Sequence, residues 1–121
     1  MRAKDIMVKD PYTLAPSHTV ADAAKIIMQR NIGSILVLEG GRLAGIFTER
    51  DLAKHVGAGG SLDTPLSEVM TRNPITVKPD TPLVVVVGKM VEHNIRHIPV
   101  VDDEGRPVGI ISSRDVLRHI L

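Results

Sequence analysis

Hydrophobic positions follow one pattern in the first half of the chain. After residue 19, apolar side chains return at helical spacing, at Val20, Ala23, Ala24, Ile27 and Met28. Thr19 stands before this stripe and Asp22 follows three residues later, which is the spacing of a capping box. We therefore expect a helix from this cap to about Asn31.

The same pattern returns at residues 81–94, where local propensity disagrees with it. Residues 84–87 are consecutive valines, a β-branched run that alone favours a strand. Thr81 is expected as the cap and Pro82 as the first helical residue. Because helical spacing continues to Met90 and Val91, and the matching segment is rich in alanine, we predict a second helix.

Short apolar runs predict the strands. Residues 33–38 and 96–101 are apolar strands, and each is followed by a glycine-containing turn and a second strand, at 43–47 or 108–111. Thr48 and Ser112 then begin the last helix of each half, and short helical turns are expected near Met7 and Met70. The predicted order in each half is β-α-β-β-α.

The two halves are copies of one unit. An offset of 63 places Met7 on Met70 and Asn31 on Asn94, and after one inserted residue near 102–104 the offset becomes 64. The insertion falls where a hairpin turn is expected. Residues 57–61 are small and lack apolar periodicity, so we divide the chain into a first repeat at 1–56, a linker at 57–63 and a second repeat at 64–121.

Composition narrows the function classes. The chain has 121 residues, 43% of them hydrophobic, which suits two small cores that share an interface. No apolar run reaches membrane-span length and no signal peptide is seen, so a cytoplasmic protein is expected. Lys plus Arg number 15 against 14 Asp plus Glu, with one Tyr and one Phe, which makes nucleic-acid binding unlikely. Cysteine is absent, and although His93 and His97 have i,i+4 spacing, the helix is expected to end between them, so no shared metal is expected.

The most specific motif occurs at the end of the second hairpin strand in each copy. Residues 45–51 and 109–115 each place a hydroxyl, Thr48 or Ser112, three residues before an acid, Asp51 or Asp115. One interpretation is a capping box alone. The other is a ribose site in which the carboxylate accepts from the diol and free N–H groups of the helix start face a phosphate.

With these residues the chain resembles, along nearly its whole length, the cystathionine-β-synthase (CBS) domain family in its tandem form, the Bateman module. The resembling segments are residues 5–7 with Pro11 and Thr13, 45–51, 68–70 with Pro74 and Thr76, 96–102 and 109–115. The resemblance implies an α/β (α+β) fold in which two β-α-β-β-α repeats pack through their sheets about a pseudo-two-fold axis. It also implies two clefts for adenosine-containing ligands, and no catalysis.

The resemblance assigns roles to particular residues. Asp51 and Asp115 would hold ribose hydroxyls, and Thr48 and Ser112 would lie beside ribose or phosphate. Adenine would be flanked by Ile35, Ile98 and the strands at Thr13 and Thr76. The family's proline in the first hairpin strand is Pro99 in the second copy, but the first copy has Leu36 there.

A second departure separates the copies. Arg96 and His97 stand where the first copy has Gly33 and Ser34. A guanidinium and an imidazole suit a phosphate, while the alternative is ordinary surface charge at a strand start. Arg50 and Arg114, in the first turns of the last helices, are weaker candidates for the same role.

We therefore expect a regulatory module that binds AMP, ADP, ATP or S-adenosylmethionine and signals through dimer packing or a separate enzyme or transporter. A homodimer is expected because Val84 and Val85 replace Ala21 and Asp22 and widen the apolar stripe. The alternative is a ligand-free assembly module. An enzyme is the class least expected, because the chain has neither a phosphate-binding P-loop nor a nucleophile elbow.

Overall fold

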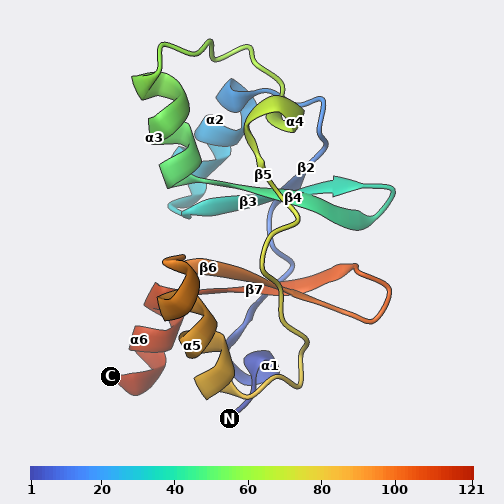
Figure 1. Ribbon diagram of the computed structural model, residues 1–121, viewed down its shortest axis with the longest axis vertical. Helices are drawn as coiled ribbons and strands as arrows, with labels where there is room; N and C mark the ends of the chain where they lie inside the picture. Colours follow the sequence, from blue (N-terminus) through green and yellow to red (C-terminus); the bar gives the residue numbers. More distant parts are fainter. The chain divides into compact units, whose positions relative to one another are not determined.

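The computed structural model of the protein describes residues 1–121 and contains six helices and seven strands (Figure 1). The helices are α1 (Ala3–Ile6), α2 (Val20–Arg30), α3 (Glu49–Gly57), α4 (Leu66–Val69), α5 (Leu83–His93) and α6 (Ser113–Ile120). The strands are β1 (Val8–Lys9), β2 (Thr13–Leu14), β3 (Ser34–Glu39), β4 (Arg42–Thr48), β5 (Thr71–Arg72), β6 (His97–Val101) and β7 (Pro107–Ser112).

The chain divides into two compact units. One, residues 12–73, has a four-stranded sheet in the order β2-β3-β4-β5, in which β2 is parallel to β3 and the other pairs are antiparallel. Its core joins inward side chains of α2 and α4 to those of the hairpin strands. The buried members are Val20, Ala23, Ile27, Ile35, Val37, Phe47, Leu66 and Met70.

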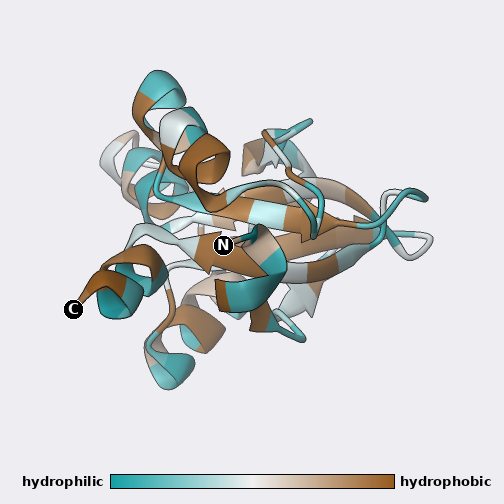
Figure 2. Ribbon diagram, turned by 90° about the horizontal axis from the view of Figure 1, so that it is seen from below, coloured by the Kyte–Doolittle hydropathy of each residue, from teal (hydrophilic) through white to brown (hydrophobic).

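The other unit joins residues 1–11 to residues 74–121. Its sheet has the order β1-β7-β6, and its buried core is Ala3, Val77, Val86, Met90, Ile98, Val100, Ile111 and Val116. In both units the strands are largely hydrophobic and the hairpin turns are pale or hydrophilic in colour (Figure 2). The mixed α and β fold predicted from the sequence is confirmed. None of the helices combines the length and the apolar character that crossing a membrane requires.

Each compact unit contains the hairpin and helices of one copy of the repeat together with the leading segment of the other copy. Strand β1 pairs with β7, whereas β5 pairs with β4, so the leading segment of each copy joins the sheet of the other. The predicted boundaries at 1–56 and 64–121 describe the sequence repeat, and the compact units exchange their leading segments relative to it.

Polar contacts attach residues 1–11, the first exchanged segment, to the loop before α5. The N–H of Ala3 donates to the carbonyl of Thr81, and the side chains of Arg2 and Lys4 lie 3.3 and 3.0 Å from the Asp80 carboxylate. The ammonium group of Lys4, with support from Arg2, lowers the pKa of Asp80 below its ordinary value. All three side chains are exposed, so solvent screens these pairs and the buried Ala3 adds the apolar part of the attachment.

The valine run is helical, as the repeat predicted. Helix α5 covers Leu83–His93, and it ends at Asn94 in the left-handed conformation, as α2 ends at Asn31. Val86 and Met90 face the core. Packing of this face outweighs the weak preference of valine for strands.

Two local predictions in the second copy are wrong. Thr81 does not cap α5, because Pro82 at ψ 140° is the last extended residue and carries no capping side chain, while the Thr81 hydroxyl accepts from the N–H of Lys78 instead. Thr76 lies outside any strand. The neighbouring Val77 makes only an isolated parallel bridge to Val100, where the first copy has β2.

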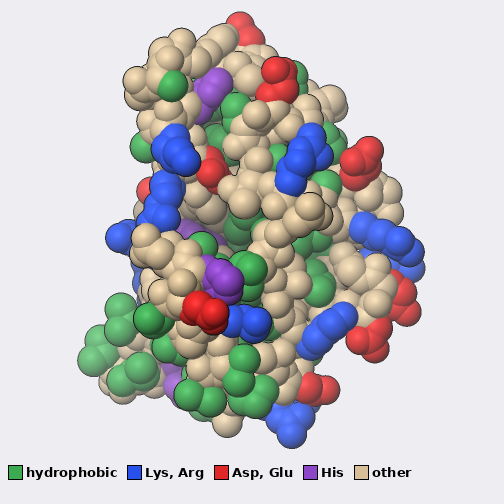
Figure 3. Space-filling model, in the orientation of Figure 1, with side chains coloured by type: hydrophobic (Ala, Val, Ile, Leu, Met, Phe, Trp, Pro, Cys, Tyr) green, Lys and Arg blue, Asp and Glu red, His purple; other side chains and the backbone are tan.

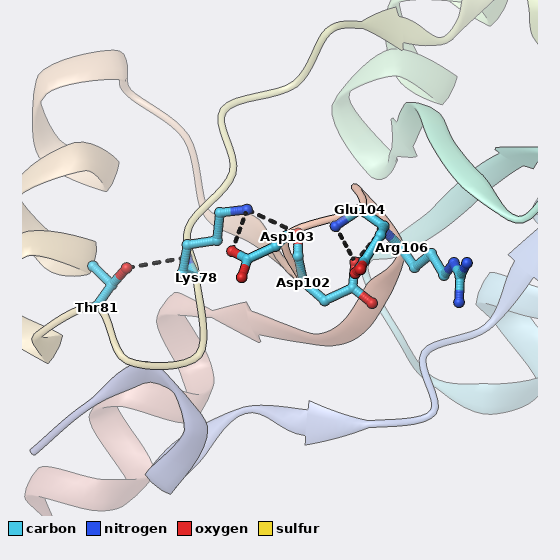
Figure 4. Close-up of polar contacts among 6 residues, drawn as sticks. All are labelled: Lys78, Thr81, Asp102, Asp103, Glu104 and Arg106. Atoms are coloured by element: carbon cyan, nitrogen blue, oxygen red, sulfur yellow. Dashed lines mark hydrogen bonds and ion pairs between the residues drawn. The ribbon is translucent and has the colours of Figure 1, made fainter.

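The inserted residue lies in the β6–β7 turn, as predicted. The shorter β3–β4 turn uses Gly40 and Gly41, both with positive φ, which suits a tight hairpin. In the longer turn Oδ1 of Asp102 accepts from the N–H groups of Glu104 and Arg106, each at 2.9 Å (Figure 4). Lys78 reaches the same turn, donating to the Asp102 carbonyl at 2.8 Å.

Two glycines of the central strands let the exchanged segments approach closely. A Cβ at Gly45 would lie 2.7 Å from Sδ of Met70 and 2.8 Å from the carbonyl oxygen of Thr71. A Cβ at Gly109 would meet Sδ of Met7 at 2.7 Å and the carbonyl of Val8 at 3.0 Å. Because backbone atoms cannot move aside as a flexible side chain can, each segment depends on the glycine beneath it.

We predict that Gly45→Ala lowers the free energy of unfolding by about 1–3 kcal/mol, because the new methyl group pushes β5 off β4. Gly57→Ala is the matched control. Its Cβ would meet nothing within 4 Å, and alanine at this helical position should add up to about 1 kcal/mol. Urea unfolding measures both variants, and wild-type stability in Gly45→Ala would contradict the close approach.

Candidate functional site

The hydroxyl and acid pairs form closed hydrogen-bonded rings at the junctions of β4 with α3 and of β7 with α6. In the first, Oδ2 of Asp51 accepts from the N–H of Thr48 at 2.9 Å and from its hydroxyl at 3.1 Å, while the Thr48 hydroxyl accepts from the Asp51 N–H at 3.2 Å. The second ring, Ser112 with Asp115, repeats these contacts at 2.8, 2.9 and 3.2 Å. Both capping boxes predicted from spacing are confirmed.

These rings differ from the capping box of α2. There Asp22 accepts from the N–H of Thr19 at 2.9 Å, and this bond lowers the pKa of the Asp22 carboxyl below its ordinary value. Asp22 is exposed, whereas Asp51 and Asp115 are half-buried. The Thr48 and Ser112 hydroxyls also donate to their carboxylates, which uses both acceptor positions of Oδ2.

In each unit Oδ1 is the carboxylate oxygen that the capping box leaves for other donors. A carboxylate oxygen accepts about two hydrogen bonds, so it suits a hydroxyl-rich ligand such as a ribose. The capping box and a ribose contact are therefore compatible, because the cap uses Oδ2 and not Oδ1.

The expectation that the first helical N–H groups are free for a phosphate is wrong for most of them. The N–H of Glu49 donates to the carbonyl of Gly33 at 3.0 Å, and that of Ser113 donates to the carbonyl of Arg96 at 2.9 Å. Asp51 and Asp115 give their N–H groups to the cap hydroxyls. A phosphate at these junctions would depend on side chains.

In the second copy, the backbone of Arg96 and His97 lies at the junction of β7 with α6. His97 pairs with Ser112 in the β6–β7 ladder, and the Arg96 carbonyl holds the start of α6. Arg96 is exposed and His97 is half-buried. In the first copy Ser34 pairs with Thr48, so the sequence correspondence holds in three dimensions. Arg50 and Arg114 are exposed in the first turns of α3 and α6.

The candidate adenine contacts divide into core and surface positions. The side chains of Ile35 and Ile98 are fully buried in the cores of their units. Leu36 and Pro99 are also fully buried in the chain, although neither belongs to the core cluster of its unit. Thr13 is exposed on β2 opposite Leu36, and Thr76 is half-buried. Of these positions, only Thr13 and Thr76 have solvent-accessible side chains.

Sequence reasoning missed one residue of the first junction. The hydroxyl of Thr71, on β5, donates to Oδ1 of Asp51 at 3.3 Å. The signal was present in the repeat, because the offset of 63 matches Thr71 with Val8, a side chain that has no donor. Only the pairing of β5 with β4 shows that this difference lies beside the carboxylate.

Comparison with known proteins places this fold and these junctions in a family. The CBS domain model matches residues 3–58 and again residues 66–121. The chain therefore belongs to the CBS domain family and holds two CBS domains in tandem. Such a pair is a regulatory ligand-binding module.

Three similar proteins define the comparison further. L-aspartate semialdehyde sulfurtransferase of Methanocaldococcus jannaschii is 41% identical over 95% of this chain, which spans 22% of that protein. The CBS domain pair of protein MJ0100, in complex with 5′-methylthioadenosine and S-adenosyl-L-methionine, is 38% identical with a TM-score of 0.92, covering 99% of this chain and 95% of that one. The CBS domain protein PAE2072 from Pyrobaculum aerophilum, complexed with AMP, is 30% identical with a TM-score of 0.89, covering 95% and 89% of the two chains.

Proposed function

We propose that this CBS pair senses an adenosine-containing metabolite and holds its ribose through Asp51 and Asp115. The observation that carries the proposal is the duplicated carboxylate whose Oδ2 is saturated by the cap and whose Oδ1 keeps at least one acceptor position. Two similar CBS proteins were solved with adenosyl compounds, one with 5′-methylthioadenosine and S-adenosyl-L-methionine and one with AMP. The candidate ligands are therefore AMP, ADP, ATP and S-adenosylmethionine.

The module would regulate the activity of another protein and would catalyse no reaction of its own. The similar sulfurtransferase devotes 22% of its length to the matching segment, which supports an enzyme as the regulated partner. We propose that ligand binding changes how the pair packs against an enzyme or transporter, or against a second copy. AMP and S-adenosylmethionine are metabolites of the cytoplasm, and the proposal places the module there.

In the first test, AMP and S-adenosylmethionine should raise the melting temperature of the wild-type protein in proportion to the logarithm of ligand concentration, because they bind the folded state. Asp51→Asn and Asp115→Asn should each weaken calorimetric binding at one site by about ten- to a hundredfold, since each removes a charge-assisted hydrogen bond.

Asp22→Asn is the matched control, because it alters the same type of capping box on α2. All three variants should change stability little, and this control should also leave affinity unchanged. Full affinity in the Asp51→Asn, Asp115→Asn double variant would remove the ribose assignment. A melting temperature that no adenosyl compound raises would favour the ligand-free assembly module.

The cations of the second copy support a further part of the proposal, that one site recognises phosphate more strongly. The backbone of Arg96 and His97 lies at the junction that holds Asp115, whereas Gly33 and Ser34 take these places in the first copy. Because backbone N–H groups at the junction are largely engaged, the Arg96 guanidinium is our principal candidate for a phosphate, with His97, Arg50 and Arg114 as secondary ones.

We predict that calorimetry with AMP resolves two unequal sites, differing by about ten- to a hundredfold, and that Arg96→Ala removes the difference. Adenosine, which has no phosphate, should bind the wild type and Arg96→Ala alike. Lys25→Ala removes an exposed cation of α2 and serves as the control. If Arg96→Ala weakened adenosine and AMP equally, Arg96 would have no phosphate role.

An apolar surface on α5 supports a homodimer. Val84 and Val91 are each 77% exposed and Val85 is 42% exposed, although the core-facing residues of the helix are already buried. Hydrophobic side chains gather over the region of α5 and α6 in the lower part of Figure 3. We propose that a second copy covers this surface.

Val85→Asp should convert the dimer to a monomer at micromolar concentration, because a charge would be buried at the contact. Sedimentation velocity measures the change. Gln29→Asp adds the same charge to an exposed position of α2 and should leave the dimer intact. A wild-type protein that sediments only as a monomer would contradict the proposal.

A further inference from the structure

The carboxylates of Asp51 and Asp115 accept the same hydrogen bonds at Oδ2 and different ones at Oδ1. Oδ1 of Asp51 accepts from the Thr71 hydroxyl at 3.3 Å. At the matching place in the other unit, Val8 pairs with Ile110 as Thr71 pairs with Ile46. Because valine has no polar side-chain atom, this position offers Oδ1 of Asp115 no donor.

Hydrogen-bonding capacity shows what this difference does to a ligand. Both acceptor positions of Oδ2 are used in each unit, by the N–H and the hydroxyl of the cap residue. Oδ1 of Asp115 keeps about two acceptor positions, enough for both hydroxyls of a ribose diol. Oδ1 of Asp51 has given one of its positions to Thr71.

Thr71 is not needed to orient the carboxylate. Asp115 has no such neighbour, yet its bonds from the cap N–H and hydroxyl, 2.8 and 2.9 Å, are shorter than the 2.9 and 3.1 Å bonds of Asp51. The cap alone therefore orients both acids. The Thr71 hydroxyl acts instead as a donor that occupies Oδ1 and withdraws electron density from it.

From this comparison we infer that Thr71 is a specificity-determining residue that competes with the ligand diol for Asp51 and weakens ribose binding at that site relative to the site of Asp115. The inference rests on the proposed function. It is independent of phosphate recognition, because adenosine carries the diol without a phosphate. The long Thr71 bond and the return of its hydroxyl to water limit the effect to about three- to tenfold in affinity.

The experiment separates the sites with the variants introduced above. In an Asp115→Asn background, which leaves the Asp51 site, Thr71→Val should tighten adenosine binding by about three- to tenfold by calorimetry. Thr71→Ser keeps the hydroxyl and should leave affinity unchanged. In an Asp51→Asn background, Val8→Thr should weaken adenosine binding by a similar factor. Thr71 and Val8 are both exposed, and threonine and valine have the same shape, so folding is preserved.

A ligand without the diol tests the cause. For 2′,3′-dideoxyadenosine, Thr71→Val should change affinity no more than Thr71→Ser does, because no ligand hydroxyl competes for Oδ1. If the Asp51 site of the wild type is too weak to measure, Thr71→Val should make it measurable.

The outcomes that overturn the inference are distinct from those that overturn the proposed function. Unchanged or weaker adenosine binding in Thr71→Val, with Asp51→Asn still reducing affinity, would overturn the competition alone. An equal gain for adenosine and the dideoxy compound would show that Thr71 acts through packing and would also overturn it. Failure of every adenosyl compound to bind the wild type would remove the proposed function and this inference together.

Discussion

The close approach of an exchanged segment to the central strand of each sheet is the contact on which the rest of the structure depends. β5 can lie against β4 because Gly45 has no side chain that would clash with Met70. In the same way, β1 can lie against β7 because Gly109 leaves room for Met7. The same segments fill the cores through Leu66 and Ala3. β5 and β1 each complete the sheet of one unit. Each strand also determines which side chain lies beside the acid of that unit.

In the proposed function, the ligand binds Oδ1, the carboxylate atom that the helix cap does not use. The capping box takes Oδ2 of Asp51 and Asp115 and satisfies N–H groups that a helix start would otherwise leave unpaired. Oδ1 of the same carboxylates takes no part in that box. A ligand site built in this way would be held rigid by the helix cap, so the carboxylate would need little ordering when a ligand binds.

Much of the architecture was predictable because the two copies of the repeat can be compared with each other. The repeat identified residues 84–87 as helical against their β propensity, and it placed the inserted residue in a turn. The hydroxyl and acid spacing identified both junctions. Local spacing failed at Thr81, where a proline that precedes the helix moved its start by one residue. It also failed at Thr76, because a strand needs a partner and only Val77 finds one.

The exchange of leading segments also sets an order for folding during synthesis. Residues 12–73 form a continuous stretch, so their unit is complete in sequence before residues 74–121 have been made. The other unit needs residues 1–11 together with residues 74–121, so residues 1–11 must wait for strands that are synthesised about a hundred residues later. Val8 can meet Ile110 only after residue 110 has been made. Since domains generally fold as units as they are synthesised, residues 1–11 reach their native place after the residues 12–73 that follow them.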